Sequence, residues 1–176
     1  LIVGSGWPFG GEFLKSDEII QRVIPHEVMI EDQSQLSETS ETLIDRLIEG
    51  AGPGQHHSEF NRDFPPGVLY VSLMPLKLDK LDEIVDLTGD LKSDGKIDIP
   101  LQPELTYLLS YGVIQKGHRM VVHGAPGAAG PVMDHYKKEV TLAYLSRLNA
   151  IAEQTGIPLS ELIRALFCDS IELEGA

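Results

Sequence analysis

The sequence predicts an α/β fold: a three-layer sandwich with a mainly parallel sheet of about four to five strands and helices on both faces. Short runs of β-branched and aromatic residues alternate along the chain with amphipathic segments at helical spacing, a pattern typical of parallel strands joined by helices. Two glycine-rich segments also each follow a predicted strand and precede a predicted helix. Ligand sites of open parallel sheets lie at such strand ends.

Four segments are predicted to be strands, and residues 68–73 are the clearest. This continuous apolar run is bounded by Gly67 and Pro75, so we expect it to form a central, buried strand. The other predicted strands cover residues 1–3, 27–31 and 119–123.

Six segments are predicted to be helices because apolar residues recur in them every three or four positions. They cover residues 17–23, 35–49, 76–87, 102–111, 133–151 and 159–167. Residues 86–100 are rich in Asp, Gly and Lys, and we expect them to form an exposed, mobile connection.

The length of 176 residues fits a single α/β domain over residues 1–176, with a helical C-terminal region over residues 131–176. One cysteine, Cys168, excludes an internal disulfide and favours a reducing, cytoplasmic location. No apolar run approaches the roughly 18 residues of a membrane span, and the N-terminal run has no basic flank typical of a signal peptide.

The charge of the chain is strongly acidic, with a net value of −13. Residues 1–113 hold 8 Lys and Arg against 20 Asp and Glu, a balance of −12, whereas the remainder is close to neutral. Long-range repulsion opposes binding to DNA, RNA or an anionic membrane. We therefore expect neither nucleic acid nor membrane as a partner.

The first glycine-rich segment, residues 4–11, contains Gly4, Ser5, Gly6 and Gly10. Glycines let a backbone approach an anion closely, and a following helix N-terminus favours negative charge. The Pro8-Phe9-Gly10-Gly11 stretch resembles the Phe-Gly-Gly turn of pyroglutamyl peptidases, but the Cys nucleophile of that family has no counterpart here. A plain turn between strand and helix is the alternative interpretation.

The second glycine-rich segment begins with His123-Gly124-Ala125-Pro126-Gly127, which resembles the oxyanion loop of α/β-hydrolases. The same stretch is similar to a P-loop and to the phosphate loop of tyrosine phosphatases, but it lacks the reactive residues of all three families. It predicts a pocket for an anion or cofactor that includes Gly124 and Gly127. Close packing of helix on strand, which also needs small residues, is the alternative.

A candidate metal site lies at His57 and Glu59, whose spacing lets both side chains point to one face of an extended chain. The alternative is a solvated loop with titrating histidines. No motif identifies a cofactor.

These patterns predict a protein that binds or acts on a small anionic ligand through its glycine-rich segments, as a hydrolase or transferase, with His123 and Ser5 as reactive groups. The alternative is a regulatory or interaction domain that forms a homodimer through its C-terminal helices. Residues 137–166 resemble ribbon-helix-helix DNA-binding domains, which implies a strand over residues 137–142 and contact with DNA.

Overall fold

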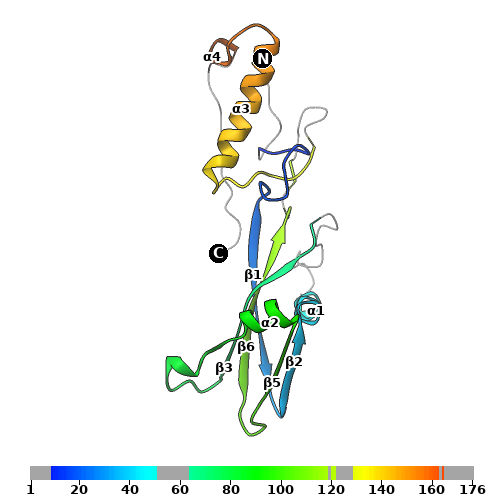
Figure 1. Ribbon diagram of the computed structural model, residues 1–176, viewed down its shortest axis with the longest axis vertical. Helices are drawn as coiled ribbons and strands as arrows, with labels where there is room; N and C mark the ends of the chain where they lie inside the picture. The colour runs from blue at the N-terminus through cyan, green and yellow to red at the C-terminus, as the bar shows by residue number, and fades with distance from the viewer. Residues whose placement is uncertain (1–8, 51–63, 119, 122–128, 163, 165–176) are drawn as a thin grey trace. The chain divides into compact units, whose positions relative to one another are not determined.

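The computed structural model describes residues 9–50, 64–118, 120–121, 129–162 and 164. The chain divides into two compact units (Figure 1). The first, here called the glycine unit, comprises Leu1–Gln21 and Gly117–Ala176, and the second, the sheet unit, comprises Arg22–Lys116. Each is described by itself, and the single domain predicted over residues 1–176 stays a prediction.

The sheet unit is built on a four-stranded sheet with the order β1 (Gln21–Ile30), β6 (Tyr107–Lys116), β3 (Gly67–Pro75) and β4 (Val85–Asp86). A second sheet pairs β2 (Gln35–Thr39) with β5 (Lys96–Pro100). The strands are antiparallel. The predicted three-layer sandwich with a mainly parallel sheet is therefore wrong.

The error lies in the predicted helices, because parallel strands need crossover connections that are usually helical. Residues 102–111 are not helical but lead into β6. Residues 76–87 hold the short 3-10 helix η2 (Leu81–Glu83) and strand β4, and residues 17–23 lead into β1. In short segments apolar residues fit both a helical and an alternating period, and burial in β6 alternates through Leu109, Tyr111 and Val113.

Strand β1 shows the same alternation around a proline. Ile24 and Ile30 are buried, whereas Val23 and Met29 are exposed. The strand contains the predicted strand 27–31 almost entirely. Pro25 does not break it because β1 is at the edge of the sheet, where a missing backbone N–H can be tolerated.

The predicted helix over residues 35–49 divides into β2 and helix α1 (Ser40–Gly50). Hydrogen bonds between Thr39 and Thr42 mark the change from strand to helix. The backbone N–H of Thr39 donates to Thr42 Oγ1 at 2.8 Å, and the N–H of Thr42 donates to Thr39 Oγ1 at 3.2 Å. This reciprocal pair has the form of a capping box and begins the helix after Thr39.

The prediction of an exposed connection over residues 86–100 is also wrong, because this segment supplies part of the core. Helix α2 (Thr88–Asp94) ends at Gly95, whose φ of 72° lies in the left-handed region. Leu87, Leu91 and Ile97 are buried. The core lies between the four-stranded sheet and the layer of α1, α2 and the second sheet, and it includes Ile24, Leu43, Leu47, Val71, Leu73, Leu109, Tyr111 and Val113.

Strand β3 is an interior strand of the sheet, as predicted, with β6 on one side and β4 on the other. Because Val71 is fully buried, we expect Val71→Ala to lower the free energy of unfolding by about 1–3 kcal/mol through lost burial and a cavity. Val23→Ala, at an exposed edge position, is the control in the same denaturant titration. Equal effects of the two substitutions would contradict the placement of β3.

In the glycine unit, short bridges join residues 131–133 to the distant N-terminal segment, Gly10 with Val132 and Ile19 with Met133, and Met120 pairs with Pro131. Helix α3 (Lys138–Gln154) follows, and α4 (Leu159–Leu162) comes after it. The helix predicted from residue 133 therefore begins later. The ribbon-helix-helix resemblance implies a strand over residues 137–142, but these residues, apart from the first, are part of helix α3.

The glycine unit has a small core of its own, formed by Met133, Val140 and Tyr144 with Phe9, Phe13, Leu14 and Leu148 packed against it. No described helix of the chain has both the length and the apolar character needed to cross a bilayer.

Candidate functional site

Most of the predicted site residues lie outside the described residues. These are Gly4, Ser5, Gly6, His57, Glu59, His123, Gly124 and Gly127. Gly10 is the exception. Among the described residues, no group of three or more His, Cys, Asp or Glu side chains is arranged to hold a metal ion.

The described ends of the two glycine-rich segments lie side by side in the glycine unit. The N–H of Gly11 donates to the carbonyl of Pro131 at 3.0 Å, and the N–H of Glu12 donates to the carbonyl of Ala129 at 2.8 Å. A Cβ atom at Gly10 would lie 2.1 Å from the oxygen of Pro131, and one at Gly130 would lie 2.3 Å from the nitrogen of Glu12. Both glycines are therefore needed for this close backbone approach.

At these two positions the small residues let one backbone pack directly on another, which is neither the plain turn nor the packing of helix on strand considered from the sequence. The backbone donors of Gly11, Glu12 and Met133 are engaged with backbone carbonyls. They hold the two segments together at this crossing.

The ionisable side chains of Asp134, His135 and Lys137 follow the crossing. Asp134 is buried, and its Oδ1 accepts the N–H of Tyr136 at 3.1 Å while Oδ2 lies 3.5 Å from Lys137 Nζ. Burial lowers the pKa of His135, and the charge of Asp134 opposes that shift. Lys137 Nζ also donates to the carbonyl of Asp17 at 2.7 Å. Lys137 directly precedes α3, so this contact joins the start of α3 to the N-terminal segment.

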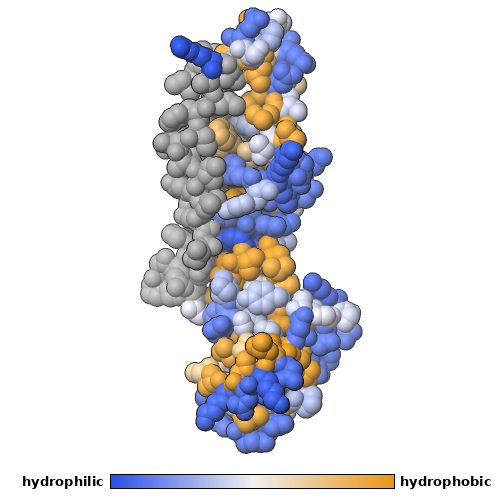
Figure 2. Space-filling model, turned by 90° about the vertical axis from the view of Figure 1, so that its left-hand side faces the viewer, coloured by the Kyte–Doolittle hydropathy of each residue, from blue (hydrophilic) through white to orange (hydrophobic). Residues whose placement is uncertain are grey.

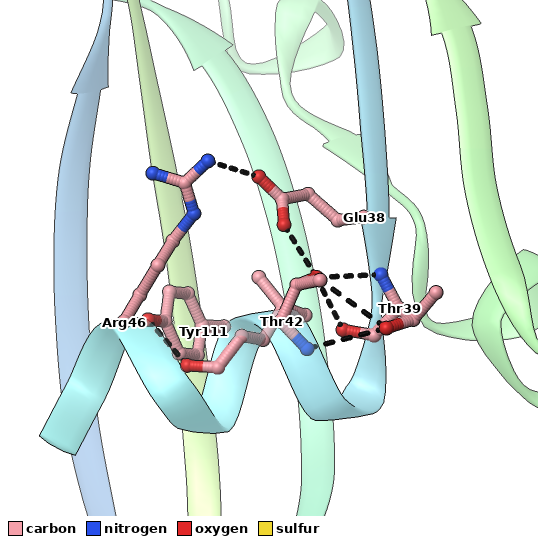
Figure 3. Close-up of polar contacts among 6 residues, drawn as sticks. Glu38, Thr39, Thr42, Arg46 and Tyr111 are labelled. Atoms are coloured by element: carbon pink, nitrogen blue, oxygen red, sulfur yellow. Dashed lines mark hydrogen bonds and ion pairs between the residues drawn. The ribbon is translucent and has the colours of Figure 1, made fainter.

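In the sheet unit, a connected polar cluster surrounds Glu38, a buried carboxylate on β2 (Figure 3). Arg46 Nη2 donates to Glu38 Oε1 at 2.7 Å, and Thr42 Oγ1 donates to Oε2 at 2.6 Å. The Tyr111 hydroxyl donates to the carbonyl of Leu43 at 2.8 Å. All of these contacts fix α1 against β2 and β6, which is a structural role.

Burial raises the pKa of Tyr111 from the ordinary 10.0 to about 12. The folded state therefore favours the neutral phenol, and that contribution to stability is complete below pH 10 and is lost as the pH rises from 10 through 12. We expect phenolate absorbance to show one of the five tyrosines titrating late. Tyr111→Phe should remove that late step, and its persistence in the variant would contradict the assignment.

Exposed apolar side chains gather on one segment of the sheet unit. Of the fifteen large hydrophobic residues exposed in the described part of the chain, five lie between residues 76 and 85. We call residues 76–86 the arm, which projects from the end of β3 (green, lower left in Figure 1). Its exposed apolar residues are Leu76, Leu78, Leu81, Ile84 and Val85.

The face of the four-stranded sheet opposite the core is also partly apolar. Cross-strand partners share a face, so Tyr70 with Gly112 and Met74 with Leu108 lie on this side. The Tyr70 ring occupies the space above Gly112, where a Cβ atom would lie 2.3 Å from Tyr70 Cε1. The side chains of Tyr70, Met74 and Leu108 are half-buried, whereas Val71, Leu73 and Leu109 on the opposite face of the sheet are buried. Figure 2 shows apolar and hydrophilic side chains interleaved over the lower part of the molecule.

The prediction of a helix over residues 76–87 concealed the arm, because Leu78, Leu81 and Val85 have helical spacing. A helix would have turned these side chains to the core. The alternation of Leu76, Lys77, Leu78 and Asp79 after Pro75 is the signal that favoured an extended segment.

Comparisons with models of protein families, with curated proteins and with solved structures found no match.

Proposed function

We propose that the chain is an interaction module that binds another protein through the arm of its sheet unit. The observation that carries the proposal is the concentration of exposed aliphatic side chains on the arm, with Leu81 80% exposed. Soluble proteins expose single apolar residues everywhere, but a contiguous group of them is typical of a binding surface. The interaction class was the alternative drawn from the sequence, although with the C-terminal helices as the contact surface.

A photo-crosslinking amino acid at position 81 tests this function in the cells that make the protein. We expect a discrete adduct of defined mass from position 81. The same amino acid at Lys92, an exposed position of α2 in the same unit, is the control and should give none. The adduct should disappear when Leu78→Asp is added, and identical adducts from both positions would refute the proposal.

A second proposed function is the one drawn from the two glycine-rich segments, whose residues Gly11 and Gly130 lie side by side. This function is binding of a small anionic ligand, with hydrolase or transferase chemistry and with His123 and Ser5 as reactive groups. A thermal-shift panel of inorganic phosphate, nucleotides and divalent metals tests it. At least one ligand should raise the unfolding temperature, and His123→Ala should reduce that rise; a panel without any shift would contradict this function.

Self-association through the C-terminal helices is supported by exposed Leu142 and Ile151 on α3 and Leu162 on α4. The glycine unit also carries less charge than the sheet unit, with 6 Lys and Arg against 10 Asp and Glu, a balance of −4. We expect light scattering to give twice the chain mass of 19.3 kDa. A single 19.3 kDa species would remove the homodimer.

A further inference from the structure

The arm holds its shape through hydrogen bonds of its own. The N–H of Asp79 donates to Glu83 Oε2 at 3.2 Å, the N–H of Glu83 donates to the carbonyl of Lys80 at 3.2 Å, and the N–H of Ile84 donates to the carbonyl of Leu81 at 3.2 Å. At its base, the N–H of Leu76 donates to the carbonyl of Thr106 at 2.8 Å. The local backbone therefore presents Leu81 to solvent instead of folding it onto the core.

Acidic groups surround these apolar side chains. The arm carries four acids, Asp79, Asp82, Glu83 and Asp86, against two lysines, Lys77 and Lys80. The whole sheet unit holds 8 Lys and Arg against 17 Asp and Glu, a balance of −9. An acidic partner, including a second copy of this chain at this surface, would be repelled, and a basic one would be attracted.

We propose that the arm docks a basic segment of a partner protein that carries its own apolar side chains between its Lys and Arg residues. The aliphatic residues of the arm cover the apolar side chains of that segment, and Asp79, Asp82 and Asp86 face its cations. This inference rests on the proposed interaction function and names the chemistry of its partner.

The test uses the full chain and two synthetic amphipathic peptides that differ only in charge, one built from Leu and Lys and the other from Leu and Glu. Fluorescence anisotropy should show that the Lys peptide binds at least about tenfold more tightly than the Glu peptide, with an affinity that falls as salt screens the acids. Equal binding of both peptides, or binding that is indifferent to salt, would overturn the charge argument.

Two variants separate docking on the arm from general attraction to an acidic protein. Leu81→Asp adds a negative charge but removes an aliphatic side chain that is 80% exposed, so it should weaken binding of the Lys peptide at least about tenfold. Met29→Asp makes the same charge change at an exposed position of β1 and should leave the affinity within about twofold. If Leu81→Asp binds as well as Met29→Asp, the arm is not the docking site.

The outcomes also distinguish this inference from the proposed function beneath it. Failure of both peptides to bind overturns the basic partner, whereas a crosslink at position 81 would still support an interaction module. Concentration-dependent self-association that Leu81→Asp abolishes would overturn the inference in favour of a second copy of the chain.

Discussion

Gly130→Ala is expected to unfold the glycine unit at lower denaturant than the natural chain. A Cβ atom at this position would lie 2.3 Å from the nitrogen of Glu12 and 2.4 Å from the carbonyl carbon of Gly11, and φ is 134°. Backbone atoms cannot move aside as the end of a side chain can. We expect a loss of about 2–4 kcal/mol from steric overlap and the disfavoured backbone conformation together.

Amide hydrogen exchange resolves this effect within the chain. Exchange in α3 should accelerate in Gly130→Ala, while exchange in β3 and β6 should not change. Gly67→Ala is the control, because no heavy atom beyond its two chain neighbours lies within 4 Å of the place that its Cβ would occupy. If the two variants exchange alike in α3, the close crossing of the glycine-rich segments is wrong.

Leu43→Ala should produce the largest destabilisation of the sheet unit. This side chain is fully buried on the inner face of α1, in the core that covers the sheet. We expect the free energy of unfolding to fall by about 2–5 kcal/mol, as removal of a core leucine side chain loses burial and leaves a cavity.

Leu81→Ala is the matched control for Leu43→Ala because the chemical change is identical and Leu81 is 80% exposed. Its effect in the same urea titration should stay below about half a kilocalorie per mole. A large effect of Leu81→Ala would mean that the arm packs onto the fold, and this would contradict its role as a free surface.

The sequence predicted the strand over residues 68–73 correctly because every cue agreed: a continuous apolar run, β-branched residues, and Gly67 and Pro75 as its boundaries. It predicted mainly parallel strands, and that direction is wrong. The direction of strands depends on the connections between them. The apolar positions of residues 102–111 fit a helix, and the alternation of Leu109, Tyr111 and Val113 becomes clear only when the segment is followed to the end of β6.

In other segments, tertiary contacts produce a structure that the local amino-acid composition does not favour. Residues 86–100 are rich in Asp, Gly and Lys, yet Leu87, Leu91 and Ile97 are buried because the rest of the unit supplies the surface that covers them. Pro25 stands within a strand because β1 is at an edge of the sheet. Neither fact can be inferred from the segment alone.

The candidate functional sites also depend on contacts that a single segment of the sequence does not reveal. Glycine enrichment at Gly10 and Gly130 was visible in the sequence, but its cause at these positions is the approach of residues 129–132 to residues 9–12. The arm was hidden by helical spacing, since periodicity identifies an apolar face without showing what covers it. Exposure of Leu81 follows from the turn at residues 81–83, which the sequence did not specify.

The most direct test of the interaction function is the reactivity of a thiol at position 81, with Cys168 replaced by Ser so that Leu81→Cys supplies the single cysteine. We predict that a maleimide modifies this thiol in the purified protein as fast as it modifies a small free thiol, because the position is exposed. In an extract of the cells that make the protein, the partner should cover position 81 and slow the reaction, whereas a cysteine at Lys92 should react at the same rate in both settings. Equal reactivity of position 81 in the purified protein and in the extract would contradict the account.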